Sequence, residues 1–89
     1  MKRDMVKAYR IGEVTGYLAR FHVAAVKLDV SLRVGDRIQI IGPLTDFRQT
    51  VESMEVQRED VKQGSAGDQA YIPVDQRVCV GDAVVLLPR

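Results

Sequence analysis

The chain has few of the residues on which many enzymes and secreted domains depend. Its 89 residues include one cysteine, one histidine and no tryptophan. A lone cysteine, Cys79, cannot form an internal disulfide, so we expect a reducing compartment and a cytoplasmic location. A metal site built around the single histidine, His22, would need carboxylates scattered along the chain. The sequence therefore predicts no disulfide framework, no metal centre and no cofactor.

Long hydrophobic runs and a strong charge imbalance are also missing. No segment approaches the roughly 20 consecutive apolar residues of a transmembrane helix, and the basic start of the chain is not followed by the apolar core of a signal peptide. Thirteen basic residues face 12 acidic ones, for a net charge of +1. This balance gives no general attraction to a membrane surface, so we expect no membrane association.

Familiar catalytic signatures are absent as well. Nothing matches the Gly-x-x-x-x-Gly-Lys-Ser/Thr loop that holds nucleotide phosphates, so we expect no GTP binding. Ser53 lacks the Gly-x-Ser-x-Gly context of a hydrolase nucleophile. Cys79 lies between two valines, an apolar setting that favours a buried structural thiol over a reactive one. We predict a protein that is not an enzyme, with a small hydrolase as the weakest alternative.

Three Gly-Asp pairs are the most informative feature that is present. Gly35-Asp36, Gly67-Asp68 and Gly81-Asp82 each precede a short apolar run. Glycine allows the positive φ of a tight turn, and aspartate can bond the backbone amides just beyond it. We expect Gly35, Gly67 or Gly81 to adopt a conformation that β-branched residues tolerate poorly. A turn that opens a strand three times is typical of an all-β domain.

The remaining pattern predicts about six strands and no helix. The expected strands cover residues 10–18, 21–28, 36–41, 47–56, 69–74 and 83–87. A small, closed, six-stranded antiparallel barrel is the economical arrangement, because closure removes exposed strand edges. We assign residues 1–9 to a polar leader and residues 10–89 to a single barrel domain.

Taken in order, the motifs are similar to those of a known family. The segments that carry the likeness are Leu-Arg-Val-Gly-Asp-Arg-Ile-Gln-Ile-Ile-Gly at 32–42, Ala-Gly-Asp at 66–68 and Val-Gly-Asp-Ala-Val at 80–84. They resemble domain II of translational GTPases, the elongation factor Tu domain II superfamily, here as a stand-alone small protein. The resemblance implies a barrel of the domain II type that associates with tRNA or the ribosome. Similar barrels occur at the C-terminus of collagenase-like peptidases.

Residues that combine cations with aromatic rings are the candidates for RNA contact. Such pairs occur at the start of the chain and around the first expected hairpin, where rings beside cations suit an RNA backbone or unpaired bases. The resemblance adds an acidic and a basic residue that match the family's next strand. The predicted RNA-binding residues are Lys7, Tyr9, Arg10, Tyr17, Arg20, Glu55 and Arg58.

Two function classes remain open. The first is a binding module associated with RNA or the translation machinery. The alternative is a protein-interaction module that partners a separately encoded enzyme, such as a collagenase-like peptidase. The carboxylates Glu52, Glu55, Glu59 and Asp60 could form an acidic patch or paired catalytic carboxylates. We interpret them as a solvated strand edge, because charged residues also protect strand edges from association.

Overall fold

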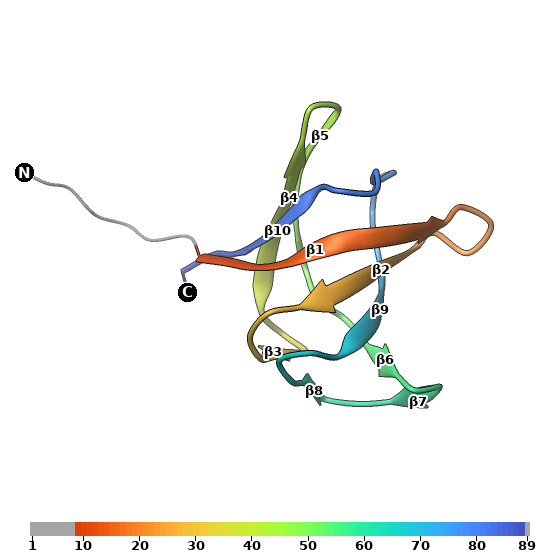
Figure 1. Cartoon of the computed structure of the whole chain (residues 1–89), viewed down its shortest axis with the longest axis vertical. Helices are drawn as coiled ribbons and strands as arrows, with labels where there is room; N and C mark the ends of the chain where they lie inside the picture. The colour runs from red at the N-terminus through yellow and green to blue at the C-terminus, as the bar shows by residue number, and fades with distance from the viewer. Residues whose placement is uncertain (1–8, 89) are drawn as a thin grey trace, which may run out of the picture.

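A computed structural model describes residues 9–88 and shows an all-β domain (Figure 1). The strands are β1 (Tyr9–Leu18), β2 (Val23–Leu28), β3 (Leu32–Arg33), β4 (Arg37–Gly42), β5 (Thr45–Thr50), β6 (Glu55–Val56), β7 (Glu59–Asp60), β8 (Gln63–Gly64), β9 (Gln69–Pro73) and β10 (Ala83–Leu86). Eight of them form one antiparallel sheet of order β5-β4-β10-β1-β2-β9-β6-β7, and β3 pairs with β8. The predicted leader lies outside the described residues except for Tyr9, the first residue of β1.

The all-β class is confirmed, but the prediction of a closed six-stranded barrel is wrong. The main sheet has eight strands, and its edge strands β5 and β7 do not pair with each other. The expected strand at 47–56 is split into β5, which ends at Thr50, and β6, which begins at Glu55. Val51 still continues the pairing with the residues just before β4: its N–H donates to the Asp36 carbonyl at 2.8 Å, and its carbonyl accepts from the Gly35 N–H at 2.7 Å. Beyond Val51 the chain leaves β4, and β6 pairs with β7 and β9.

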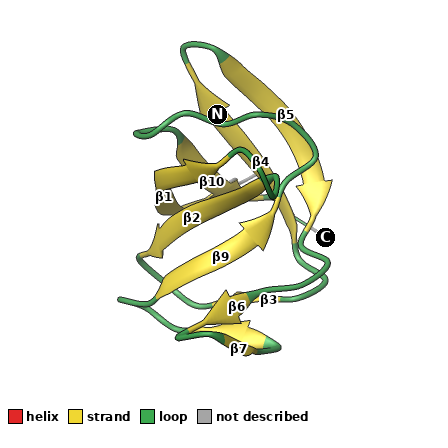
Figure 2. Ribbon diagram, turned by 90° about the vertical axis from the view of Figure 1, so that its right-hand side faces the viewer, coloured by secondary structure: helices red, strands yellow, loops and turns green. Residues whose placement is uncertain are grey.

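The open sheet still curls around a single core (Figure 2). Phe47 on the edge strand β5, Val14 on β1 and Ile72 on β9 all belong to one buried cluster. Along β9 the side chains alternate, with Ala70 and Ile72 buried and Tyr71 between them half-buried. Each such apolar side chain contributes about 1.5–3 kcal/mol when it is fully buried. The core therefore leaves the outer face of the sheet free to carry a site.

The three Gly-Asp turns adopt one geometry, at residues 33–36, 65–68 and 79–82. Their glycines have φ values of 101°, 91° and 96°, which confirms the prediction of positive φ. In each turn the aspartate N–H donates to the carbonyl three residues earlier, at 3.1, 3.0 and 3.0 Å. Its carboxylate accepts the N–H of that same earlier residue, at 2.9, 2.8 and 2.8 Å. The aspartate thus closes its turn backwards and does not cap the strand that follows.

Candidate binding groove

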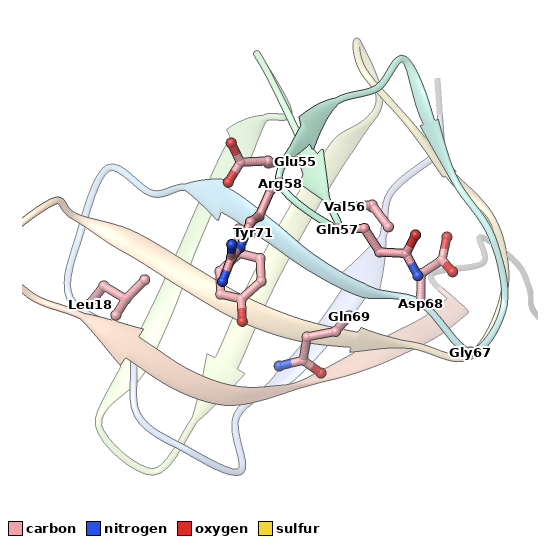
Figure 3. Close-up of a pocket in the computed structure, with 9 residues that line it drawn as sticks. All are labelled: Leu18, Glu55, Val56, Gln57, Arg58, Gly67, Asp68, Gln69 and Tyr71. Carbon is pink, nitrogen blue, oxygen red and sulfur yellow. The ribbon is translucent and has the colours of Figure 1, made fainter.

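A groove of about 500 Å³ lies on the outer face of the sheet, between the end of β1, β9 and the β6–β7 hairpin (Figure 3). Tyr71 forms part of its wall because its neighbours on β9, Ala70 and Ile72, point into the core and side chains alternate along a strand. Glu55 lies beside Tyr71 in the β6–β9 pairing. The groove is lined by Leu18, Glu55, Val56, Gln57, Arg58, Gly67, Asp68, Gln69 and Tyr71.

An irregularity in β1 turns Leu18 toward the groove. The pairing of β1 with β2 shifts register between Val14 and Gly16, which leaves Thr15 as an extra residue. Such a bulge reverses the alternation of the side chains beyond it. Tyr17 therefore packs against the core, whereas Leu18 lies outward and is 44% exposed. The Thr15 hydroxyl is held by a 2.6 Å hydrogen bond from the Gln69 side-chain amide.

The turn between β6 and β7 forms another part of the wall and is strained. Gln57 and Arg58 have φ values of 53° and 68°. A two-residue hairpin turn with positive φ at both positions strongly prefers Asn-Gly, because most side chains disfavour this conformation. The cost is about 1 kcal/mol or more for each ordinary residue. Strain is thus located at two residues that line the groove.

The groove contains charges of both signs that are not neutralised internally. Among the residues that the structure describes, neither Glu55 nor Arg58 makes an ion pair. Glu55 lies directly opposite Asp60 in the β6–β7 pairing, so two carboxylates face each other across neighbouring strands. Like charges in this arrangement destabilise a sheet. The Asp68 carboxylate is already used by the Ser65 N–H of its own turn.

Two smaller hollows continue the groove around the hairpin. A hollow of about 180 Å³ shares Glu55 and Tyr71 with the groove. A third, of about 140 Å³, shares Ser53, Met54 and Asp60 with the second. We call these three neighbouring hollows the β6–β7 trough.

Between residues 9 and 88, no group of three His, Cys, Asp or Glu side chains could hold a metal ion. Cys79 is half-buried, and its N–H donates to the Asp82 carboxylate. No helix in this part of the chain is long and apolar enough to cross a membrane.

The residues predicted to form one RNA-contacting cluster lie far apart. Lys7 is outside the described residues, whereas Tyr9 and Arg10 are exposed at the start of β1. The Arg10 guanidinium forms an ion pair with Glu13 at 3.1 Å. Arg20 follows the other end of β1, about 30 Å away at the usual rise of a strand.

Only two of the predicted residues meet in the groove. Glu55 and Arg58 both line it, whereas Tyr17 packs on the core and the Arg20 guanidinium lies 5.9 Å from the centre of the Phe21 ring. Seven groove residues were not predicted from the sequence: Leu18, Val56, Gln57, Gly67, Asp68, Gln69 and Tyr71. The alternation of side chains along residues 69–73 could have placed Tyr71 on the outer face. No feature of the neighbouring sequence identifies the other residues as part of a groove.

Comparison with known proteins gives both a sequence relative and structural neighbours. No family model matches the chain. A protein of Methanocaldococcus jannaschii described as an uncharacterized protease is 33% identical over 78 residues, which are 86% of this chain and 19% of that protein. The chain thus spans about a fifth of this relative.

The matching solved structures show the same fold. The C-terminal domain of a Geobacillus thermoleovorans protein described as a U32 peptidase superposes with a TM-score of 0.85 at 18% identity, covering 90% of this chain and 93% of that domain. The selenomethionine variant of this domain superposes with a TM-score of 0.80 at 19% identity, covering 84% and 95%.

These findings correct the interpretation as a translation-factor domain II, and with it the RNA-binding assignment. The relative is a protease, and the structural neighbours are the C-terminal domain of a peptidase. The Gly-Asp turns form corners of the sheet, so they indicate a fold. They gave a wrong function because a fold does not by itself specify a function. The alternative was a protein-interaction module that partners a separately encoded enzyme such as a collagenase-like peptidase. The comparisons support its coarser part, a peptidase-associated domain.

Proposed function

We propose that this chain is a non-catalytic module that acts together with a peptidase of the U32 type by binding its catalytic domain. The observation that carries the proposal is the extent of the sequence match. Nearly the whole of this chain aligns with only 19% of a protease, so the likeness concerns one part of an enzyme. The superposition on a peptidase's C-terminal domain supports the same assignment.

The composition of the groove supports a binding role. Its lining includes an arginine, two carboxylates, two glutamine amides and a tyrosine, but no serine, threonine, cysteine, histidine or lysine. Nucleophilic catalysis requires a nucleophile beside a base that activates it. Mixed polar groups around exposed apolar side chains are instead typical of a protein-recognition surface.

A binding measurement tests this proposal. The chain is purified alongside the catalytic domain of the peptidase in its own organism that is most similar to the Methanocaldococcus jannaschii protease. We expect a saturable complex in calorimetric titration and a change in the cleavage of a protein substrate when the chain is added. No complex in the micromolar range would contradict the proposal, as would cleavage of the substrate by the chain alone.

A further inference from the structure

We propose that the β6–β7 trough binds an extended polypeptide segment that carries an apolar anchor residue next to basic side chains. This inference deepens the proposed function, because it names the surface by which the module would contact its peptidase. The occupant follows from three properties of the trough, namely its shape, its apolar wall and its charge.

The shape favours an extended chain over a compact ligand. Three hollows of about 500, 180 and 140 Å³ follow one another, because the second shares Glu55 and Tyr71 with the first and Asp60 with the third. An extended segment advances about 3.3 Å per residue and presents alternate side chains to the same side. Several consecutive residues could therefore place their side chains in successive hollows.

The main groove offers an apolar wall for an anchor. Leu18 is 44% exposed, and the half-buried Val56 and Tyr71 line the same hollow. Tyrosine presents a large, rigid surface with a polar end, and it is among the residues that contribute most to protein interfaces. An aliphatic or aromatic side chain of the partner would contact this wall.

The charge of the trough selects a basic partner. The carboxylates of Glu52, Glu55, Asp60 and Asp68 line it, against the cations of Arg58 and Lys62. Glu55 and Asp60 lie opposite each other, and in the described part of the chain neither has a cationic partner. A lysine or arginine placed between them would relieve their repulsion, and complementary charge gives specificity to an interface.

A second apolar surface provides a matched control. Leu44, at the tip of the β4–β5 hairpin, is 88% exposed, and this tip lies at the opposite end of the domain from β7 (Figure 1). A change from leucine to arginine can therefore be made on the trough at Leu18, or far from it at Leu44.

Peptide titration tests the trough directly. Two synthetic peptides, Lys-Val-Leu-Lys-Val-Lys and Glu-Val-Leu-Glu-Val-Glu, are titrated into the labelled protein and followed by nuclear magnetic resonance. We expect saturable shifts of the Leu18 and Val56 methyl groups and the Tyr71 ring with the basic peptide only. Equal binding of the acidic peptide, or shifts centred on Leu44, would overturn the inference.

Variants separate binding from stability. Glu55→Gln should raise the urea midpoint of unfolding, because it removes one of two facing carboxylates. It should also lower the affinity for the basic peptide several-fold. Leu18→Arg and Glu55→Lys should each weaken binding of the basic peptide about tenfold. Leu44→Arg should not, and neither should Asp46→Lys, which changes an exposed carboxylate of the same β4–β5 hairpin. A loss of affinity on Leu44→Arg equal to that on Leu18→Arg would contradict the inference.

The two proposals fail in different ways. If the peptidase domain binds the wild type and the trough variants equally, the trough is wrong and the proposed function stands. If the basic peptide binds in the trough but the peptidase domain does not bind, the proposed function is wrong and the trough stands.

Discussion

The Gln49 side-chain amide donates a hydrogen bond to the main-chain carbonyl of Pro73 at 2.9 Å. Gln49 belongs to the edge strand β5, and Pro73 is the last residue of β9. The same side chain accepts the Asp75 N–H through its oxygen at 2.8 Å, and the residue is only 5% exposed. A single buried side chain thus joins two parts of the sheet that do not pair through their backbones.

Replacing this side chain should therefore loosen the domain. Gln49→Leu keeps the approximate volume but leaves the Pro73 carbonyl and the Asp75 N–H without their partner, at a cost of about 1–3 kcal/mol in the free energy of unfolding. Urea denaturation measures the loss. The control is Gln39→Leu on β4, whose side chain bonds Asp46 at the surface and whose loss should cost about 0.5 kcal/mol or less. Equal effects would contradict a bridging role for Gln49.

Substitution by alanine should lower the stability of the domain by different amounts at two glycines. A Cβ at Gly42 would overlap the carboxylate of Asp82, which is 1% exposed and has little room to move. A Cβ at Gly81 would meet no atom within 4 Å, so only its φ of 96° opposes the change. We expect Gly81→Ala to cost about 1 kcal/mol and Gly42→Ala to cost about 2 kcal/mol or more. Thermal denaturation of both variants checks the order, which the reverse ranking would refute.

The aspartates of two turns make the same hydrogen bond in different surroundings. Asp82 is buried and accepts the Cys79 N–H, whereas Asp68 accepts the Ser65 N–H in an exposed turn. Asp82→Ala should cost about 2–3 kcal/mol because a buried N–H loses its partner, whereas Asp68→Ala should cost about 1 kcal/mol because water replaces the carboxylate. Chemical denaturation at one pH compares the two, and similar losses would show that burial does not govern these turns.

The strained turn at Gln57 and Arg58 should be improved by the residues that its geometry prefers. Gln57→Asn with Arg58→Gly should stabilise the domain by about 1 kcal/mol, because both new residues accept positive φ at lower cost. The single variants should each give part of the gain in urea midpoint. A destabilised double variant would indicate that the native side chains contribute contacts that outweigh the backbone strain.

Local features of the sequence predicted the parts of this fold that local forces determine. Gly35, Gly67 and Gly81 could be assigned positive φ because glycine alone adopts it without a steric cost. The open sheet could not be predicted, because it depends on which strands pair across long stretches of the chain, such as β6 with β9. The burial of Gln49 is equally non-local, since its partners lie 24 and 26 residues away.

The groove was only partly predictable for a related reason. Glu55 and Arg58 were selected through a family likeness that proved wrong in function, yet both line the groove. Gln57 gives no local sign of a turn, because neither it nor Arg58 favours positive φ. The pairing of β6 with both β7 and β9 fixes the chain around it, and tertiary structure imposes the conformation.

Around the extra residue Thr15, the number of residues in β1 matters more than which amino acids they are. Most exchanges of Thr15 would leave the count of residues in β1 intact and both ends of the strand in phase. An insertion of one residue after Gly16 would rotate the rest of the strand by one position, so that Leu18 entered the core and Tyr17 the groove. Homologues that tolerate many substitutions here should therefore still conserve the spacing between Val14 and Leu18.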